Sequence, residues 1–208
     1  MVLNQEGFNQ WAANYDQSVA QSQQEQSYPF AGYDEVLARI EKRIAAHPGA
    51  LVLDAGFGTG VLTERLARAG AVLSGFDFAS AMVDSVKEKL PQAQLFIHDF
   101  NDGWPAVLAE DQFDFIVSTY ALHHCGMPDQ IAWIQAMTAH LKPQGQVLIG
   151  DIAFENEEAY KLCRRQSGSR WDDEETYLTR KQLQAVFGSQ FTWERCSFCA
   201  ALMIFKAR

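Results

Sequence analysis

A carboxylate followed by three alternating glycines is the strongest chemical signal in this chain. The apolar run 51–53 predicts a buried parallel strand, because such strands are covered by helices on both faces and are continuously apolar. Asp54 ends this strand, and Gly56, Gly58 and Gly60 follow it. Glycines permit positive φ angles and let a backbone turn touch a ligand. We therefore expect a ligand-binding turn beside an acid that suits a cation.

The glycine spacing separates two classes of nucleotide ligand. A dinucleotide fingerprint has glycines at its first, third and sixth positions, whereas the sixth position counted from Gly56 is Val61. Asp54 would also repel a pyrophosphate, so an NAD-dependent oxidoreductase is the weaker alternative. The segment resembles the first motif of the class I S-adenosylmethionine-dependent methyltransferases. This resemblance implies that Asp54 and the glycines hold the methionine end of S-adenosyl-L-methionine, which carries an ammonium and a sulfonium.

A second acid follows at the end of the next expected strand, 71–76. Asp77 lies where a carboxylate can accept hydrogen bonds from both ribose hydroxyls, and a purely structural acid is the simpler alternative. The segment Gly-Phe-Asp-Phe-Ala-Ser-Ala-Met at 75–82 resembles the second motif of the family, although the family often has a serine two positions after the acid. The resemblance implies that Phe78 and Met82 border the adenosine.

A third acid, Asp99, follows the expected strand 94–98. The family places an acid or an amide here against the adenine amino group. The Asp99 carboxylate can accept from that group, and Phe100 can present an apolar face to the base. Without the resemblance, this segment would be read as an ordinary turn.

The segment 113–124, Phe-Asp-Phe-Ile-Val-Ser-Thr-Tyr-Ala-Leu-His-His, resembles the motif that follows the fourth strand of the family. The resemblance implies that this strand end lies beside the methionine part of the cofactor and faces the methyl acceptor. Ser118 is therefore a candidate cofactor contact, and Tyr120 and His123 are candidates for the reaction crevice. His123 has a pKa suited to a general base. The histidine pair could instead anchor a loop by hydrogen bonds to the backbone, and we favour the anchor.

Metal or redox chemistry is not expected from the histidines and cysteines. The run His123-His124-Cys125 has adjacent ligands and lacks the usual spacing of a metal site. The single Cys196-Ser-Phe-Cys199 has no second pair, so packing of small thiols in the core is the simpler reading.

The N-terminal segment resembles a lid. Residues 8–16, Phe-Asn-Gln-Trp-Ala-Ala-Asn-Tyr-Asp, are similar to the lid motif of the small bacterial methyltransferases, which implies that Trp11 and Tyr15 cover the cofactor. We expect an N-terminal helical lid segment at 1–47 and an S-adenosylmethionine-binding core at 48–208, within one structural domain. The resemblance extends over nearly the whole chain, and it is closest to uncharacterised bacterial proteins linked to sulfur-amino-acid recycling.

The expected elements form an α/β, Rossmann-like, doubly wound sheet of seven strands with helices on both faces. The apolar patterns predict the following strands, with helices between them: 51–53, 71–76, 94–98, 113–118, 146–152, 191–197 and 200–205. The resemblance implies that the sheet is mostly parallel and that the last strand is antiparallel. Thr179 and Gln182 have the spacing of a capping box, which predicts a helix running to about residue 187.

Composition limits the partners. The 208 residues suit one domain, and a net charge of −9 disfavours nucleic acid or an anionic membrane. The first residues lack the features of a signal peptide, and no apolar run approaches the ~20 residues of a membrane span, so we expect a cytoplasmic protein. The expected function is S-adenosylmethionine-dependent methyl transfer (EC 2.1.1.-) to a small molecule by in-line displacement. A non-catalytic S-adenosylmethionine sensor or partner-binding module is the alternative, and the acceptor and the oligomeric state are not predicted.

Overall fold

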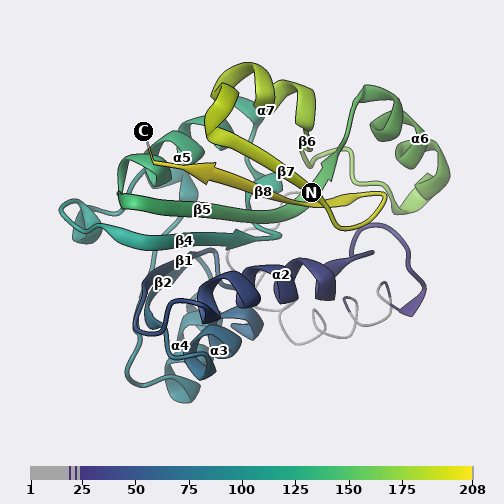
Figure 1. Cartoon of the computed structure of the whole chain (residues 1–208). Helices are drawn as coiled ribbons and strands as arrows, with labels where there is room; N and C mark the ends of the chain where they lie inside the picture. The colour runs from purple at the N-terminus through teal and green to yellow at the C-terminus, as the bar shows by residue number, and fades with distance from the viewer. Residues whose placement is uncertain (1–18, 20–21, 23, 208) are drawn as a thin grey trace.

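The apolar runs of the sequence form a single twisted sheet in a computed structural model, which describes residues 19, 22 and 24–207. Figure 1 shows the sheet with helices packed on both of its faces. Its strands have the following bounds: β1 Leu51–Ala55, β2 Val72–Asp77, β3 Gln94–Ile97, β4 Phe113–Thr119, β5 Leu141–Phe154, β6 Leu178–Thr179, β7 Phe191–Arg195 and β8 Ala200–Lys206. The main strands run in the order β3-β2-β1-β4-β5-β8-β7, and β6 pairs with the end of β5.

The strand directions confirm the expected fold class. Strands β1 to β5 pair in parallel, whereas β8 lies antiparallel between β5 and β7. The connections from β1 to β3 move outward in one direction, and the chain then returns to place β4 on the other side of β1. Open α/β sheets bind ligands at such a reversal, outside the carboxyl ends of the strands. The three acids predicted from sequence lie at this edge.

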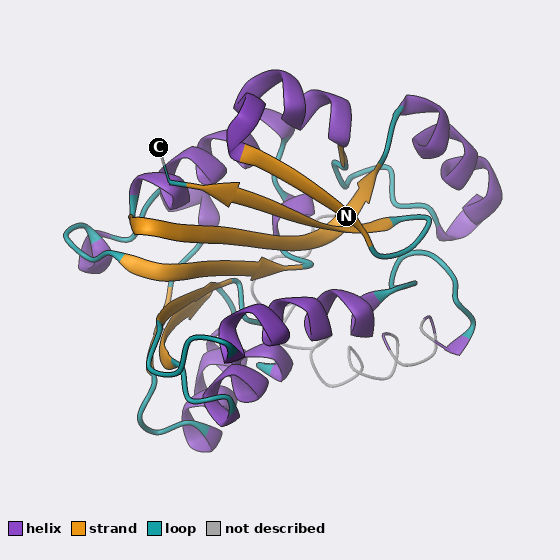
Figure 2. Cartoon of the chain, in the orientation of Figure 1, coloured by secondary structure: helices purple, strands orange, loops and turns teal. Residues whose placement is uncertain are grey.

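The helices form two layers. Helices α2, α3 and α4 lie on one face, and α5 and α7 lie on the other (Figures 1 and 2). Their bounds are α2 Tyr33–Ala45, α3 Val61–Arg68, α4 Ser80–Lys89, α5 Met127–Ala139, α6 Glu157–Ser167 and α7 Arg180–Phe187. Helix α6 belongs to the insertion between β5 and β6 and lies beyond the end of the sheet (Figure 2). Each layer has its own apolar core against the sheet.

Helix α2 shows why these elements form where they do. Its apolar side chains Val36, Leu37, Ile40 and Ile44 recur at helical spacing and are fully buried against the sheet. Acidic residues occupy its first turn and basic residues its last turn, which complements the helix dipole. These side chains belong to the same apolar core as Val52 of β1. The expected division into a lid segment at 1–47 and a core at 48–208 stays a prediction.

The sheet differs from the expected one at β5 and β6. Strand β5 begins at Leu141, which pairs with Phe113, and the register with β4 then shifts between Phe113 and Phe115. Its far end extends because β6 adds alongside it, with Ala153 paired to Leu178. A two-residue strand carries no sequence period, so β6 was not predicted. The capping box at Thr179 is present and begins α7.

Across the ranges that the structure describes, no helix has both the length and the apolar character needed to span a membrane.

Candidate functional site

The glycine turn after β1 adopts the left-handed conformations that its sequence predicts. The φ angles are +75° at Gly56, +55° at Gly58 and +80° at Gly60. A Cβ on Gly56 would lie 2.8 Å from the Cβ of Ala121, and one on Gly60 would lie 2.6 Å from Val86. A Cβ on Gly58 would meet nothing within 4 Å. Packing therefore requires two of the glycines, and the third leaves open space for a ligand.

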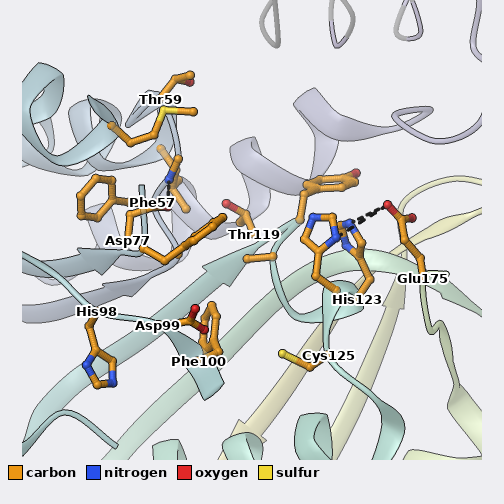
Figure 3. A pocket seen from close by; sticks show the side chains of 18 of the residues that line it. Phe57, Thr59, Asp77, His98, Asp99, Phe100, Thr119, His123, Cys125 and Glu175 are labelled. Atoms are coloured by element: carbon orange, nitrogen blue, oxygen red, sulfur yellow. Dashed lines mark hydrogen bonds and ion pairs between the residues drawn. The ribbon is translucent and has the colours of Figure 1, made fainter. Parts of the chain in front are cut away.

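That space belongs to a cavity of about 790 Å³ at the carboxyl ends of the strands, within the size range of small-molecule sites. Figure 3 shows its lining, with Asp77 and Phe57 toward one end and His123 and Glu175 toward the other. The predicted site residues that line it are Gly56, Gly58, Asp77, Phe78, Met82, Asp99, Phe100 and His123. Tyr120, the other candidate for the reaction crevice, lines it as well.

Three predicted residues do not line this cavity. Asp54 and Ser118 are completely buried behind it, and Gly60 is the N-cap of α3. The Ser118 hydroxyl donates to the backbone carbonyl of Ala55 at 2.8 Å, so this side chain joins β4 to β1. Two further predictions, Trp11 and Tyr15, lie outside the described residues.

Asp54 is a buried acid with one unsatisfied oxygen. Its Oδ2 accepts a hydrogen bond from the Thr63 hydroxyl at 2.8 Å, and its Oδ1 has no hydrogen-bond partner within the part of the chain that the structure describes. Burial, followed by the nearby charge of Asp77 and opposed by the Thr63 hydrogen bond, raises the pKa of Asp54 to about 7. An uncompensated carboxylate under a ligand-binding turn suits a cationic ligand.

Asp77 is oriented by the two turns that it joins. Its Oδ2 accepts from the Gly58 amide and its Oδ1 from the Ala79 amide, both at 2.9 Å. Burial raises the pKa of Asp77, while these hydrogen bonds oppose the increase. An ionised carboxylate has about four acceptor positions, so Asp77 can still accept from a ligand in the cavity.

Asp99 and Phe100 are held at the end of β3 by local hydrogen bonds and ring contacts. Asp99 caps a short 3₁₀ turn by accepting from the backbone and side-chain amides of Asn101, at 2.8 and 2.9 Å. The Phe100 ring lies edge-on to Trp133 with centroids 4.8 Å apart, and the Trp133 indole donates to the Phe100 carbonyl at 3.0 Å. An acceptor and an apolar ring thus lie side by side at the cavity wall.

The opposite end of the cavity contains a histidine and two acids. The His123 Nδ1–H donates to Asp151 Oδ1 at 2.6 Å, and His123 Nε2 lies 3.6 Å from Glu175 Oε1. Burial alone would lower the pKa of His123, but the charge and hydrogen bond of Asp151, with the charge of Glu175, raise it above its ordinary value. This histidine is oriented by a carboxylate and presents its second nitrogen to the cavity.

His124 and Cys125 differ from His123 in their surroundings. Partial burial, and then repulsion from His123, lower the pKa of His124. Burial, reinforced by nearby acids, raises the pKa of Cys125 to about 11, so its thiol stays protonated. Figure 3 shows the Cys125 side chain pointing away from Glu175.

Comparison with known proteins identifies the family. Residues 52–145 match the methyltransferase domain family. An uncharacterised methyltransferase of Oceanobacillus iheyensis is 34% identical over 163 residues, which cover 76% of this chain and 73% of the relative. One of Geobacillus thermodenitrificans is 32% identical over 189 residues, covering 88% and 85%. The chain belongs to the bacterial S-adenosylmethionine-dependent methyltransferases.

The fold of this methyltransferase is also found in solved structures. The crystal structure of magnesium protoporphyrin IX methyltransferase from Synechocystis with bound S-adenosylhomocysteine aligns with a TM-score of 0.66 at 18% identity, covering 86% of this chain and 85% of that one. S-adenosylmethionine is the methyl donor of the family, and a nucleotide oxidoreductase is no longer needed as an alternative.

Tyr120 has a strained backbone in this methyltransferase. Its φ of +50° is uncommon for a bulky residue and is typical of functional sites. The ring lies 5.4 Å from Phe30 and 5.1 Å from Tyr33, measured between centroids. All three rings line the cavity, so the segment before α2 covers the end of β4.

Two polar residues of the methyltransferase site were missed in the sequence. Asp151 lies within β5, whereas Asp54 and Asp77 were identified as acids at the ends of apolar strands. Glu175 lies in the charged insertion between α6 and β6, where several acids alternate with no period. Only the folded chain selects Glu175 among them.

The aromatic residues of this insertion lie away from the cavity. Tyr160, Trp171 and Tyr177 pack against one another and against Phe154 and Tyr28. They cover the end of the sheet.

Proposed function

We propose that this methyltransferase transfers the methyl group of S-adenosylmethionine to a small molecule bound beside His123. The observation that carries this proposal is a single cavity lined at one end by Gly58, Asp77 and Asp99 and at the other by His123 and Glu175. Such a concave site suits a small acceptor. The net charge of −9 also disfavours nucleic acid or an anionic membrane as the acceptor.

The first end of the cavity fits the donor. The open space at Gly58 would accept the methionine portion of the donor. Asp54 does not line the cavity, but its unsatisfied oxygen lies beneath the turn and would attract the cationic groups of the donor electrostatically. Asp77 would accept from the ribose hydroxyls. Asp99 would accept from the adenine amino group, and Phe100 would lie against the base. Phe78 and Met82 would border the adenosine, and Ser118 would act only by fixing β4 to β1.

The other end of the cavity would hold the acceptor. Bound S-adenosylmethionine supplies a methyl group already activated by its sulfonium, so the protein chiefly aligns the reactants and excludes water. The rings of Phe30, Tyr33 and Tyr120 line the cavity and would exclude water from the reacting groups. His123, oriented by Asp151, is placed to take a proton from an acceptor that must lose one.

We further propose that the segment 1–47 covers a core formed by 48–208, and that the protein works in the cytoplasm. The four cysteines are free thiols, as is usual for cytoplasmic proteins.

The donor assignment is tested by calorimetry with S-adenosylhomocysteine on the wild type and on Asp77→Asn. Asparagine keeps one acceptor oxygen and places an amide against a backbone N–H, so we expect affinity to fall at least about tenfold. Asp84→Asn is the matched control, because Asp84 is an exposed acid on α4 outside the cavity. Equal affinity in wild type and a folded Asp77→Asn protein would contradict the ribose assignment.

The acceptor is tested by following S-adenosylhomocysteine release with panels of amines, thiols, carboxylates and phenols. We expect turnover with at least one class. Tight donor binding without turnover on any class would favour a non-catalytic S-adenosylmethionine sensor.

A further inference from the structure

Two histidines and a glutamate converge at the acceptor end of the cavity. Glu175 Oε1 lies 3.6 Å from His123 Nε2 and 3.8 Å from His124 Nδ1. The three ligand atoms lie within 4.8 Å of one another. Figure 3 shows the dashed lines that join the histidines to Glu175. The side chains of His123 and Glu175 are 6% and 18% exposed, and that of His124 is 36% exposed, so the cluster is half-buried and faces the cavity.

We propose that His123, His124 and Glu175 bind a divalent transition metal ion of the zinc type. Two imidazoles and one carboxylate are a ligand set found in open zinc sites, where a water or substrate takes the fourth position. Ligand atoms around tetrahedral zinc are about 3.3–3.5 Å apart for bonds of about 2.0–2.2 Å. The two distances to Glu175 exceed this spacing by a few tenths of an ångström. The two imidazole nitrogens lie within 4.8 Å of each other, so the imidazoles would also have to move together to close the site.

The geometry leaves a place for a cation between these groups. His123 directs its Nδ1–H to Asp151, which leaves Nε2 facing a Glu175 oxygen at a distance too long for a hydrogen bond. A metal ion between them would be bound by both atoms and would also engage the neighbouring His124 nitrogen.

Supporting residues hold the ligands in the manner of metal sites. Histidine ligands usually donate their other N–H to a carboxylate, and ligating carboxylates are hydrogen-bonded in turn. Asp151 accepts from His123, and the Tyr177 hydroxyl donates to the Glu175 oxygen that faces away from the histidines. Both oriented ligands thus have a second partner.

The insertion is attached to this loop without the Glu175 side chain. The backbone of Thr176 donates to the His123 carbonyl at 2.9 Å, and the Gln130 amide joins the carbonyls of Cys125 and Thr176, both at 2.8 Å. The His123 side chain anchors the loop to β5 through Asp151, and this leaves its Nε2 available for a ligand.

With the ion bound to its Nε2, His123 would not itself act as a base. The ion would take the acceptor's oxygen, nitrogen or sulfur atom at its open position and lower the pKa of that atom, the released proton passing to solvent. This part of the inference rests on the proposed function, whereas metal binding itself does not.

Cobalt titration after removal of metals with a chelator tests the site. Co²⁺ bound to this ligand set gives visible absorption, and we expect one Co²⁺ per chain, displaced by one Zn²⁺. His124→Gln and Glu175→Gln should each weaken Zn²⁺ binding at least about 100-fold, and Asp151→Asn should weaken it about 10–100-fold. His47→Gln is the control for adventitious binding by an exposed surface histidine, and we expect it to leave Zn²⁺ affinity unchanged.

Two outcomes would overturn the inference. Absence of stoichiometric Co²⁺ or Zn²⁺ binding would mean that a proton on His123 is the cation between the side chains. Metal binding that survives both His124→Gln and Glu175→Gln would be adventitious. S-adenosylhomocysteine affinity, measured on every protein, separates this result from the proposed function, because donor binding without metal refutes only the metal site.

Discussion

Asp54 is the residue whose protonation depends most on whether a cation is bound above it. Its carboxyl group is fully buried, and one oxygen has no hydrogen-bond partner among the residues described. The folded protein holds a proton on Asp54 up to about pH 7, whereas the ordinary value is 3.8. Between these values the folded state binds more protons than the unfolded state, so this group makes stability fall as pH rises.

We expect Asp54→Asn to remove that pH dependence. The unfolding free energy of Asp54→Asn relative to wild type should increase from pH 4 to pH 7 by at most about 4 kcal/mol. Melting temperatures of both proteins, measured at each pH, should follow the same trend. Asp84→Asn, on the exposed face of α4, should show no comparable trend. Parallel pH profiles for Asp54→Asn and wild type would show that Asp54 ionises normally.

The residue scale also shows what the sequence could predict. Asp77 was found because it closes an apolar strand, and parallel strands bring their carboxyl ends to one edge. Asp99, by contrast, was assigned from the family resemblance, because its segment alone would be read as a turn. Asp151 was missed because it lies inside the predicted strand 146–152 and inside β5, and not at a strand end. No rule identifies Glu175, because its position depends on how the insertion folds back over β5 through the two-residue β6. The expectation that no metal ligands gather here considered only the adjacent run 123–125.

At the scale of elements, the glycine turn fixes how α3 packs against α4. Gly60 is the left-handed N-cap of α3, and any side chain there would meet Val86 of α4. The sequence indicated a turn at this point, since three glycines rarely have another role after a buried strand. It could not assign the separate tasks of the glycines, because the neighbours of each one are distant in the chain.

We expect Gly60→Ala to destabilise the protein by about 1–3 kcal/mol more than Gly49→Ala. Both glycines have φ of +80°, so both substitutions impose the same backbone strain. A Cβ on Gly49 meets nothing within 4 Å, whereas one on Gly60 meets the Val86 side chain at 2.6 Å. Urea unfolding measures the free energy of unfolding of both variants. Equal decreases for Gly60→Ala and Gly49→Ala would show that α4 can move to accommodate the added methyl group without loss of stability.

At the scale of the whole molecule, the order of the strands determines where ligands can bind. The reversal between β1 and β4 opens the carboxyl edge of the sheet, and the cavity occupies that edge. The alternation of strands and helices predicted this architecture, and the family resemblance implied the antiparallel β8. The length of β5 and the path of the insertion were not predictable, because they depend on pairing with β6 and β8.

We expect S-adenosylhomocysteine to stabilise the whole fold. At a concentration 100 times its Kd, a ligand adds about 2.7 kcal/mol, which corresponds to an increase of roughly 5–10 °C in melting temperature for a chain of this size. NADH at the same concentration should leave the melting temperature unchanged. Thermal melts followed by circular dichroism make the comparison, and stabilisation by NADH but not by S-adenosylhomocysteine would contradict the donor assignment of the cavity.

The strand reversal has a consequence for how such a protein can diversify. Gly58 follows β1, Asp77 ends β2 and Asp99 follows β3, whereas His123 follows β4, Asp151 lies in β5 and Glu175 lies in the insertion before β6. The two sets occupy opposite sides of the reversal. Substitutions on the second side could redirect the protein to a new substrate while the first side remained unaltered, which makes the insertion the natural place to begin engineering its selectivity.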